Sequence, residues 1–268
     1  MGGVVAGRLT ATPGTSVRHC GRHSGTARRP SGGREPDGRV GRSAPLSTLS
    51  TVGRLVVIEG LDGAGKRTLT DALTAALAEV GASVATLAFP RYGVSVHADL
   101  VREALHGAHG DLGDSVYGMG LLYALDRRGA ADEIRALRAG HDVLLLDRYV
   151  ASNAAYQAAR LRQGADSEVV RWVRDLEIER FGLPVPDAHL LLRVAPEVAA
   201  ARARGRAESD ATRARDAFES DDGLQARCAA VYDELAAANW LSPWHVVDGA
   251  DRVDAAALAA DLLGTRLP

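Results

Sequence analysis

The chain has 268 residues, 46% of them hydrophobic, so it is long enough for one α/β domain with a substantial core. Its net charge of −2 hides an asymmetry, because residues 1–52 hold eight arginines and only Glu35 and Asp37 as acids. The acidic remainder is a poor nucleic-acid binder. No apolar run is long enough to cross a bilayer, and two cysteines are too few for a disulfide scaffold, which favours a reducing cytoplasm.

Residues 1–52 are rich in Gly, Ser, Arg, Pro and Thr and show no sustained period of 2 or 3.6. We interpret them as a disordered basic extension and residues 53–268 as the folded domain. The acid-poor composition also suits an organelle transit peptide, but an amphipathic stripe is missing. Two further interpretations stay open: a genuine tail, or a wrongly assigned start with the true chain beginning near Val52 or Arg54.

From Arg54 onward the pattern becomes regular. Short apolar runs predict strands at residues 55–60, 83–89, 142–147, 188–194 and 244–249. Helical patterns cover residues 66–80, 115–139, 150–161, 167–181, 196–204, 214–238 and 253–263. Strands that alternate with helices predict an α/β fold, in which a parallel sheet carries helices on both faces.

The stretch GLDGAGKRT lies between the first strand and the first helix. Glycines at 60, 63 and 65 allow successive backbone N–H groups to curve around an anion at a helix N-terminus. Lys66, the sole lysine of the chain, stands at the helix start. The pattern G-x-x-x-x-G-K-[ST] matches up to its last position, where Arg67 replaces the hydroxyl residue and Thr68 follows. The sequence therefore predicts a phosphate-binding loop.

That missing hydroxyl normally ligates Mg²⁺, and arginine cannot ligate a cation, so the metal needs another anchor. Asp62 is the nearest carboxylate. Asp147, at the end of the third strand, has the form of a Walker B acid, although it would also suit the cap of the next helix. Arg67 either adds positive charge at the transferring phosphate or points to solvent.

The motifs GLDGAGKRT, FPRYG, LDRYVASNAAYQAA and RDAFE together resemble those of thymidylate kinases, and most closely the actinobacterial form. The similarity runs from Arg54 to about Val247. It implies a three-layer P-loop kinase fold with a five-stranded parallel sheet and an Arg-rich lid. It further implies transfer of the ATP γ-phosphoryl group to dTMP, with Mg²⁺ as cofactor, and a homodimer formed through helices.

The resemblance also implies roles for individual residues. Lys66, Arg148, Asp62 and Asp147 would be catalytic, with Asp147 orienting Arg148 or holding Mg²⁺. ATP would contact Gly60, Leu61, Asp62, Gly63, Ala64, Gly65, Lys66, Arg67, Thr68, Arg202 and Arg206. dTMP would contact Phe89, Tyr92, Tyr123, Arg127, Arg148, Ser152, Asn153, Tyr156 and Asp216. The metal ligands would be Asp62, Asp147 and Glu219, and a cis Phe89–Pro90 bond would suit the loop after the second strand.

The lid is expected at about residues 202–215, where five arginines would close over phosphates and exclude water. The same segment would also suit a solvated charged helix. Tyr123 alone would suit the core, but its spacing from Arg127 puts both residues on one helix face.

Three rival functions remain: another nucleotide kinase with different base preference, a guanine-nucleotide switch, and a catalytically inactive nucleotide-binding protein. The switch needs an N-K-x-D motif, which the sequence lacks because its one lysine lies in the phosphate loop.

Overall fold

The computed structural model describes residues 52–209, 217–250 and 253–264, apart from the side chains of residues 206–209 and 219. The chain divides into two units, residues 1–46 and 47–268, and all described residues belong to the second unit. The expected extension, apart from Val52, and residues 210–215 of the expected lid therefore lie outside the described residues, as do the lid side chains of residues 206–209. Among these residues, no helix combines the length and apolar character that crossing a membrane requires.

Five parallel strands form one sheet in the order β2-β3-β1-β4-β5. The strands are β1 (Arg54–Glu59), β2 (Val84–Ala88), β3 (Val143–Asp147), β4 (Ala188–Arg193) and β5 (Trp244–Asp248). The helices are α1 (Lys66–Glu79), α2 (Val96–Leu105), α3 (Val116–Gly129), α4 (Ala131–Gly140), α5 (Val150–Arg160), α6 (Glu168–Arg174), α7 (Pro196–Ser209), α8 (Ala217–Ser220), α9 (Asp222–Ala237) and α10 (Ala255–Leu262). The α/β prediction with a five-stranded parallel sheet is confirmed.

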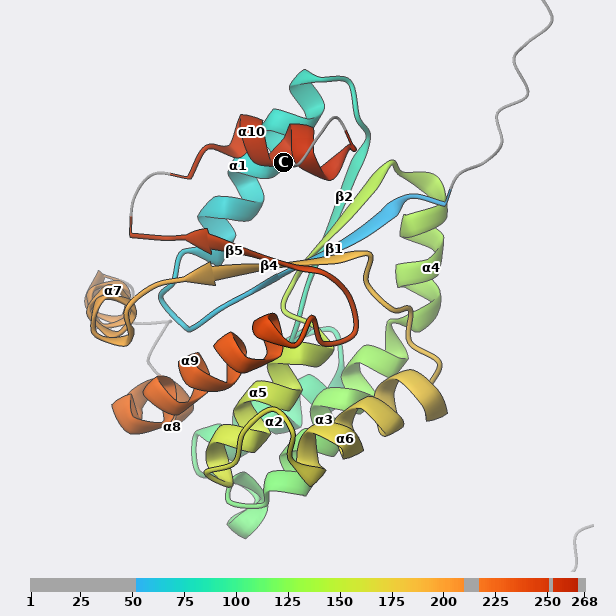
Figure 1. Cartoon of the computed structure of the whole chain (residues 1–268). Coiled ribbons are helices and arrows are strands. Elements are labelled where there is room, and N and C mark those ends of the chain that lie inside the picture. Colours follow the sequence, from blue (N-terminus) through green and yellow to red (C-terminus); the bar gives the residue numbers. More distant parts are fainter. Residues whose placement is uncertain (1–51, 210–216, 251–252, 265–268) are drawn as a thin grey trace, which may run out of the picture. The chain divides into compact units, whose positions relative to one another are not determined.

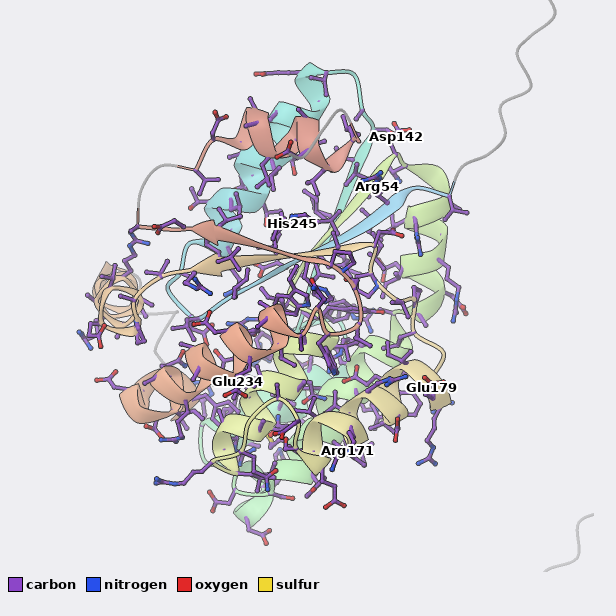
Figure 2. The ribbon with its side chains drawn as sticks, viewed as in Figure 1. Arg54, Asp142, Arg171, Glu179, Glu234 and His245 are labelled. Atoms are coloured by element: carbon purple, nitrogen blue, oxygen red, sulfur yellow. The ribbon has the colours of Figure 1, made fainter. Side chains whose placement is uncertain are left out.

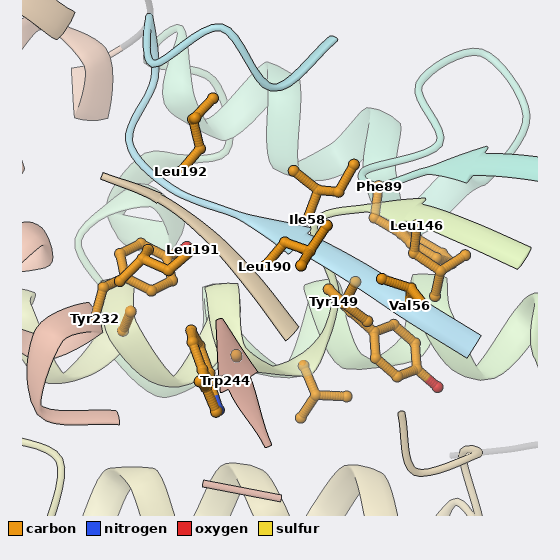
Figure 3. Packing of buried hydrophobic residues seen from close by; sticks show 14 of the residues in the cluster. Val56, Ile58, Phe89, Leu146, Tyr149, Leu190, Leu191, Leu192, Tyr232 and Trp244 are labelled. Atoms are coloured by element: carbon orange, nitrogen blue, oxygen red, sulfur yellow. The ribbon is translucent and has the colours of Figure 1, made fainter. Parts of the chain in front are cut away.

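The burial of each strand agrees with its position in the sheet. In the central strand β1, residues from Leu55 to Ile58 are fully buried, because a parallel strand covered on both faces needs a continuous apolar run. The edge strands β2 and β5 instead alternate in burial. Val56, Ile58, Leu146 and Leu190 bring neighbouring strands into one core (Figure 3).

Helices cover both faces of this sheet. Helices α1 and α10 pack against each other on one face, and α5 and α9 pack together on the other, with α3 and α6 beyond them (Figure 1). The loops that follow β1, β2 and β3 lie at the carboxyl edge of the sheet, where α/β folds bind ligands.

Two expected helices are divided. The stretch 115–139 is split at Ala130, whose ψ of −1° turns the chain between α3 and α4. The stretch 214–238 is split before α9, because Asp221 leaves the helical conformation and its side chain accepts from Leu224 N at 2.8 Å. Helix α2 was not predicted, and α6 continues into a π-helical segment, Asp175–Arg180.

Candidate active site

The loop between β1 and α1 requires glycine at several positions. Gly60, Gly63 and Gly65 have φ values of 145°, 86° and 101°, which side chains disfavour. A Cβ added to Gly63 would lie 2.0 Å from the carbonyl oxygen of Ala199 on α7. The loop therefore packs tightly against α7 and forms a backbone cradle that ends at the N-terminus of α1.

Lys66 lies inside this cradle and is buried. Its Nζ donates to the carbonyl oxygens of Leu61 at 2.9 Å and Gly60 at 3.3 Å. Burial and the nearby Arg148 charge lower the pKa of Lys66 to about 8, although Asp62 opposes the shift. The ammonium group is thus still mostly protonated at neutral pH, and it is held next to the amides that would surround a phosphate.

Arg148 links the loop to a neighbouring pocket. Its backbone takes a φ of 66° directly after β3, and its Nη2 donates to Asp62 Oδ1 at 2.5 Å. Tyr156 OH on α5 donates to the other carboxylate oxygen of Asp62 at 2.6 Å. Burial would raise the pKa of Asp62, but the Arg148 and Lys66 charges outweigh it and hold that pKa well below its usual range. Asp62 is therefore ionised at any physiological pH.

Glu59 at the end of β1 fixes this arrangement and was missed by the sequence analysis. The carboxylate is fully buried and accepts from Tyr149 N at 3.0 Å, Ser152 N at 3.1 Å, Ser152 Oγ at 2.5 Å and Tyr232 OH at 3.0 Å. These bonds hold the start of α5 and hence the left-handed turn at Arg148. A glutamate that ends an otherwise apolar strand was the available signal.

Asp147 was expected to orient Arg148 or to hold Mg²⁺. The described hydrogen bonds of Arg148 go to Asp62, Ser152, Tyr156 and Tyr232, so they do not show a direct bond to Asp147, and the role of Asp147 stays a prediction. Asp62 reaches the guanidinium from the loop and orients it directly.

Asp147 Oδ1 is buried and has no hydrogen-bond partner among the described residues. A buried carboxylate oxygen without a donor suits Mg²⁺ or one of its waters, since Mg²⁺ usually takes one or two carboxylates together with substrate phosphates. Both Asp62 oxygens already accept hydrogen bonds. The described residues contain no preformed group of three His, Cys, Asp or Glu ligands.

A pocket opens beside Arg148 at the carboxyl edge of β2 and β3. It is lined by Asp62, Phe89, Pro90, Tyr92, Tyr123, Arg127, Arg148, Ser152, Asn153, Tyr156, Gln157 and Phe218. The structure thus brings eight of the nine expected dTMP residues together, and the ninth, Asp216, lies outside the described residues. The Phe89–Pro90 bond is cis, as expected.

Two polar side chains on the pocket wall are held by a buried acid. Arg127 Nε and Nη2 donate to Glu177 Oε2 and Oε1 at 2.5 and 2.7 Å, and Asn153 Nδ2 donates to Glu177 Oε1 at 2.8 Å. Glu177 was missed, as were Gln157 and Phe218. Its signal was an acid on the apolar face of the helix that Val169, Val173 and Leu176 define.

A second cleft lies on the other side of the phosphate loop. Its lining includes Thr68, Leu192, Arg202 and Gly249. Arg202 Nη1 donates weakly to the carbonyl oxygens of Ala64 at 3.4 Å and Gly249 at 3.3 Å. Arg67 is exposed, which agrees with the alternative that it points to solvent. The side chains of Arg206 and Glu219 lie outside the described set.

The carboxyl end of the central strand carries a glycine cradle that one lysine closes. Two clefts adjoin this cradle, one bordered by Arg148 and the other by Arg202. This is the organisation of a P-loop kinase. A thymidylate kinase family model matches residues 58–256. The thymidylate kinase of Mycobacterium tuberculosis (strain ATCC 25618 / H37Rv) is 56% identical over 214 residues, which cover 80% of this chain and 99% of that protein. The thymidylate kinase of Akkermansia muciniphila is 34% identical over 222 residues, covering 81% and 94%. The chain belongs to the thymidylate kinase family.

Proposed function

We propose that this chain transfers the γ-phosphoryl group of ATP to dTMP and releases ADP and dTDP. The bond between the γ-phosphorus and the bridging oxygen breaks, and its electron pair stays on ADP. A new bond forms between that phosphorus and an oxygen of the dTMP phosphate. The observation that carries the proposal is the bridge from the phosphate loop to the pocket, formed by Asp62, Arg148 and Tyr156.

The acceptor needs no general base. A phosphate monoester loses its second proton with a pKa of about 6, so an acceptor oxygen is already anionic at neutral pH. The chemistry instead needs two anions to be held in line and the moving charge to be stabilised. We assign the ATP phosphates to the amides of residues 60–68 and to Lys66, whose ammonium lies among them.

Arg148 would contact the phosphates of both nucleotides. Its guanidinium lies between the loop carboxylate of Asp62 and the pocket residue Ser152, at 2.5 and 3.0 Å. The opposing Asp62 charge raises the pKa of Arg148 despite burial, so the group is permanently cationic. Removing that charge should therefore affect the chemical step more than substrate binding.

The pocket would take the thymidine part of the acceptor. Phe89 and Tyr123 supply rings for the base, and Arg127 and Asn153 supply polar groups for its edge. Tyr156 would lie under the sugar, where its hydroxyl is fixed by Asp62. Tyr92 at the mouth of the pocket would reach the acceptor phosphate.

We assign Mg²⁺ to Asp147, directly or through water, and keep Asp62 and Glu219 as the further ligands that the family resemblance implies. When bound, the ion would neutralise charge on the ATP phosphates. The orphaned Asp147 oxygen supports this assignment. Addition of EDTA should abolish turnover, and restored Mg²⁺ should recover it.

The cleft lined by Thr68 and Arg202 would hold the nucleoside side of ATP. Arg202 already contacts the loop backbone, which supports its role in the lid. Arg206 and the acids Asp216 and Glu219 keep the roles that the family resemblance gives them.

We further infer a homodimer in a reducing cytoplasm, with residues 53–268 as the catalytic domain. Exposed apolar side chains on α2 and α3, including Val96, Tyr117 and Leu121, support an interface there. Cys228 is buried with a free thiol, which suits a reducing compartment. Sedimentation equilibrium would measure the oligomeric state directly.

The deciding experiment is a coupled assay of ADP release with each common nucleoside monophosphate in turn. We expect dTMP to give the highest kcat/KM. Faster turnover of AMP, GMP or CMP would refute the proposed acceptor.

A further inference from the structure

A buried glutamate lies behind the pyrimidine side of the pocket. Glu177 is fully buried in the π-helical segment, whereas Glu179, two residues later, lies on the outside of the molecule (Figure 2). The charge of Glu177 is compensated by a bidentate ion pair with Arg127, with N–O distances of 2.5 and 2.7 Å. Such a pair fixes the plane of the guanidinium as well as its position.

The same carboxylate determines which way the Asn153 amide faces. Asn153 Nδ2 donates to Glu177 Oε1 at 2.8 Å and to the Gly120 carbonyl oxygen at 3.0 Å. Both partners can only accept hydrogen bonds. If the amide turned over, its oxygen would meet two acceptors, and the buried carboxylate would lose a donor. The amide oxygen must therefore face the other way.

A second charged residue fixes the opposite end of the same chain of amides. Asn153 Oδ1 accepts from Gln157 Nε2 at 3.2 Å, and Gln157 Oε1 accepts from Arg160 Nη1 at 3.1 Å. Arginine can only donate. Arg160 also donates through Nη2 to the Gly113 carbonyl oxygen at 2.6 Å, which holds it in place. The hydrogen bonds thus run in one direction, from Arg160 through Gln157 and Asn153 to Glu177.

We propose that Glu177 and Arg160 are positioning residues that set base specificity by locking the Asn153 amide. This inference rests on the proposed function. Asn153 Oδ1 keeps a lone pair for the N3–H of thymine, and Arg127 keeps N–H donors for the O4 acceptor. Cytosine presents an acceptor at N3 and a donor at N4. In the locked pocket the acceptor Asn153 Oδ1 would face N3 and the donor Arg127 would face N4, so neither hydrogen bond could form. A freely turning amide would lose this discrimination.

The test is the variant Glu177→Gln, which keeps the shape but replaces a pure acceptor with an amide that also donates. We measure kcat and KM with dTMP and with dCMP, and the KM for ATP. The KM for dTMP should rise by about tenfold or more, and the dTMP/dCMP ratio of kcat/KM should fall by about tenfold or more. The kcat with dTMP and the KM for ATP should change by less than about threefold.

The matched control is Asp132→Asn, which removes the negative charge from the exposed ion pair between Asp132 and Arg135. It should leave all of these values unchanged. Loss of activity toward dTMP and dCMP in equal proportion would overturn the proposal, because a merely structural role lowers both. If Glu177→Gln fails to fold, Arg160→Met tests the proposal instead, because Arg160 is partly exposed and lies at the other end of the series of hydrogen bonds. It should lower the ratio by about threefold or more, and an unchanged ratio overturns the proposal.

Failure of the proposed function would be recognised separately. In that case the wild-type protein itself would prefer another monophosphate. A wild-type protein that prefers dTMP, together with variants of unchanged selectivity, refutes only the locking of the amide.

Discussion

Replacement of Tyr232 by phenylalanine tests the buried network that holds Arg148. The substitution removes one hydroxyl and keeps the ring, which is almost fully buried on α9. That hydroxyl donates to Glu59 Oε2 at 3.0 Å and lies 2.9 Å from Ser152 Oγ. A hydrogen bond to a charged group contributes about 1.5–3 kcal/mol. Three donors to Glu59 remain, so we expect a loss in the lower half of that range.

The matched control is Tyr149→Phe, which removes a hydroxyl that donates to the neutral carbonyl oxygen of Pro184 at 3.1 Å. A neutral hydrogen bond contributes about 0.5–1.5 kcal/mol. For a domain of this size, each 1 kcal/mol shifts Tm by about 2–4 °C. In thermal unfolding, Tm should therefore fall by about 3–9 °C for Tyr232→Phe and by less for Tyr149→Phe.

The two variants should also differ in activity. Loss of the Tyr232 hydroxyl frees one side of Arg148, so kcat should fall, whereas Tyr149→Phe should keep the wild-type kcat. Equal Tm shifts, or a larger shift for Tyr149→Phe, would refute the claim that Glu59 organises this region.

The remaining predictions concern the charge at the reaction, the loop, the pH dependence and the N-terminal segment. Arg148→Ala should lower kcat by about 10²–10³-fold with an unchanged circular dichroism spectrum, and near-normal turnover would contradict its assigned role. Gly63→Ala places a methyl group 2.0 Å from Ala199 O at a φ of 86°, so ATP affinity and Tm should both fall, as calorimetry would measure. Burial lowers the pKa of His189 to about 3, below its unfolded value of about 6.5, so its contribution to stability is complete above pH 6.5 and is lost as the pH falls toward 3. Urea unfolding at pH 7 and pH 5 should show that loss at up to about 1.4 kcal/mol per pH unit, and His189→Phe should reduce it. Removal of residues 1–52 should leave kcat and Tm unchanged, and a large loss of activity would show that the segment contributes.

The elements that follow from local pattern were predictable from the sequence. The continuous apolar runs of β1 and β3 predicted parallel strands, and the glycine-rich turn before Lys66 predicted a phosphate loop. The helix divisions at Ala130 and Asp221 were not predicted, because the helical periodicity of the sequence continues through both positions. A local change in the backbone conformation ends the helix at each of them. Helix α2 was missed although its sequence carries an apolar stripe, since Ala98, Val101, Ala104 and Leu105 recur at helical spacing and are buried.

The sequence by itself determined the family, because the motifs that carry the resemblance are local, and that resemblance supplied eight of the residues that line the pocket but not Gln157 or Phe218. Only the tertiary structure decided which charges pair. Glu59 meets Ser152 across 93 residues, and Glu177 meets Arg127 across 50. Such pairs depend on how separate elements pack, and a local pattern contains no information about a partner on another element. For the same reason the sequence did not show that Asp62 hydrogen-bonds Arg148 from the loop, or that Asp147 Oδ1 has no hydrogen-bond partner in the part of the chain that the structure describes.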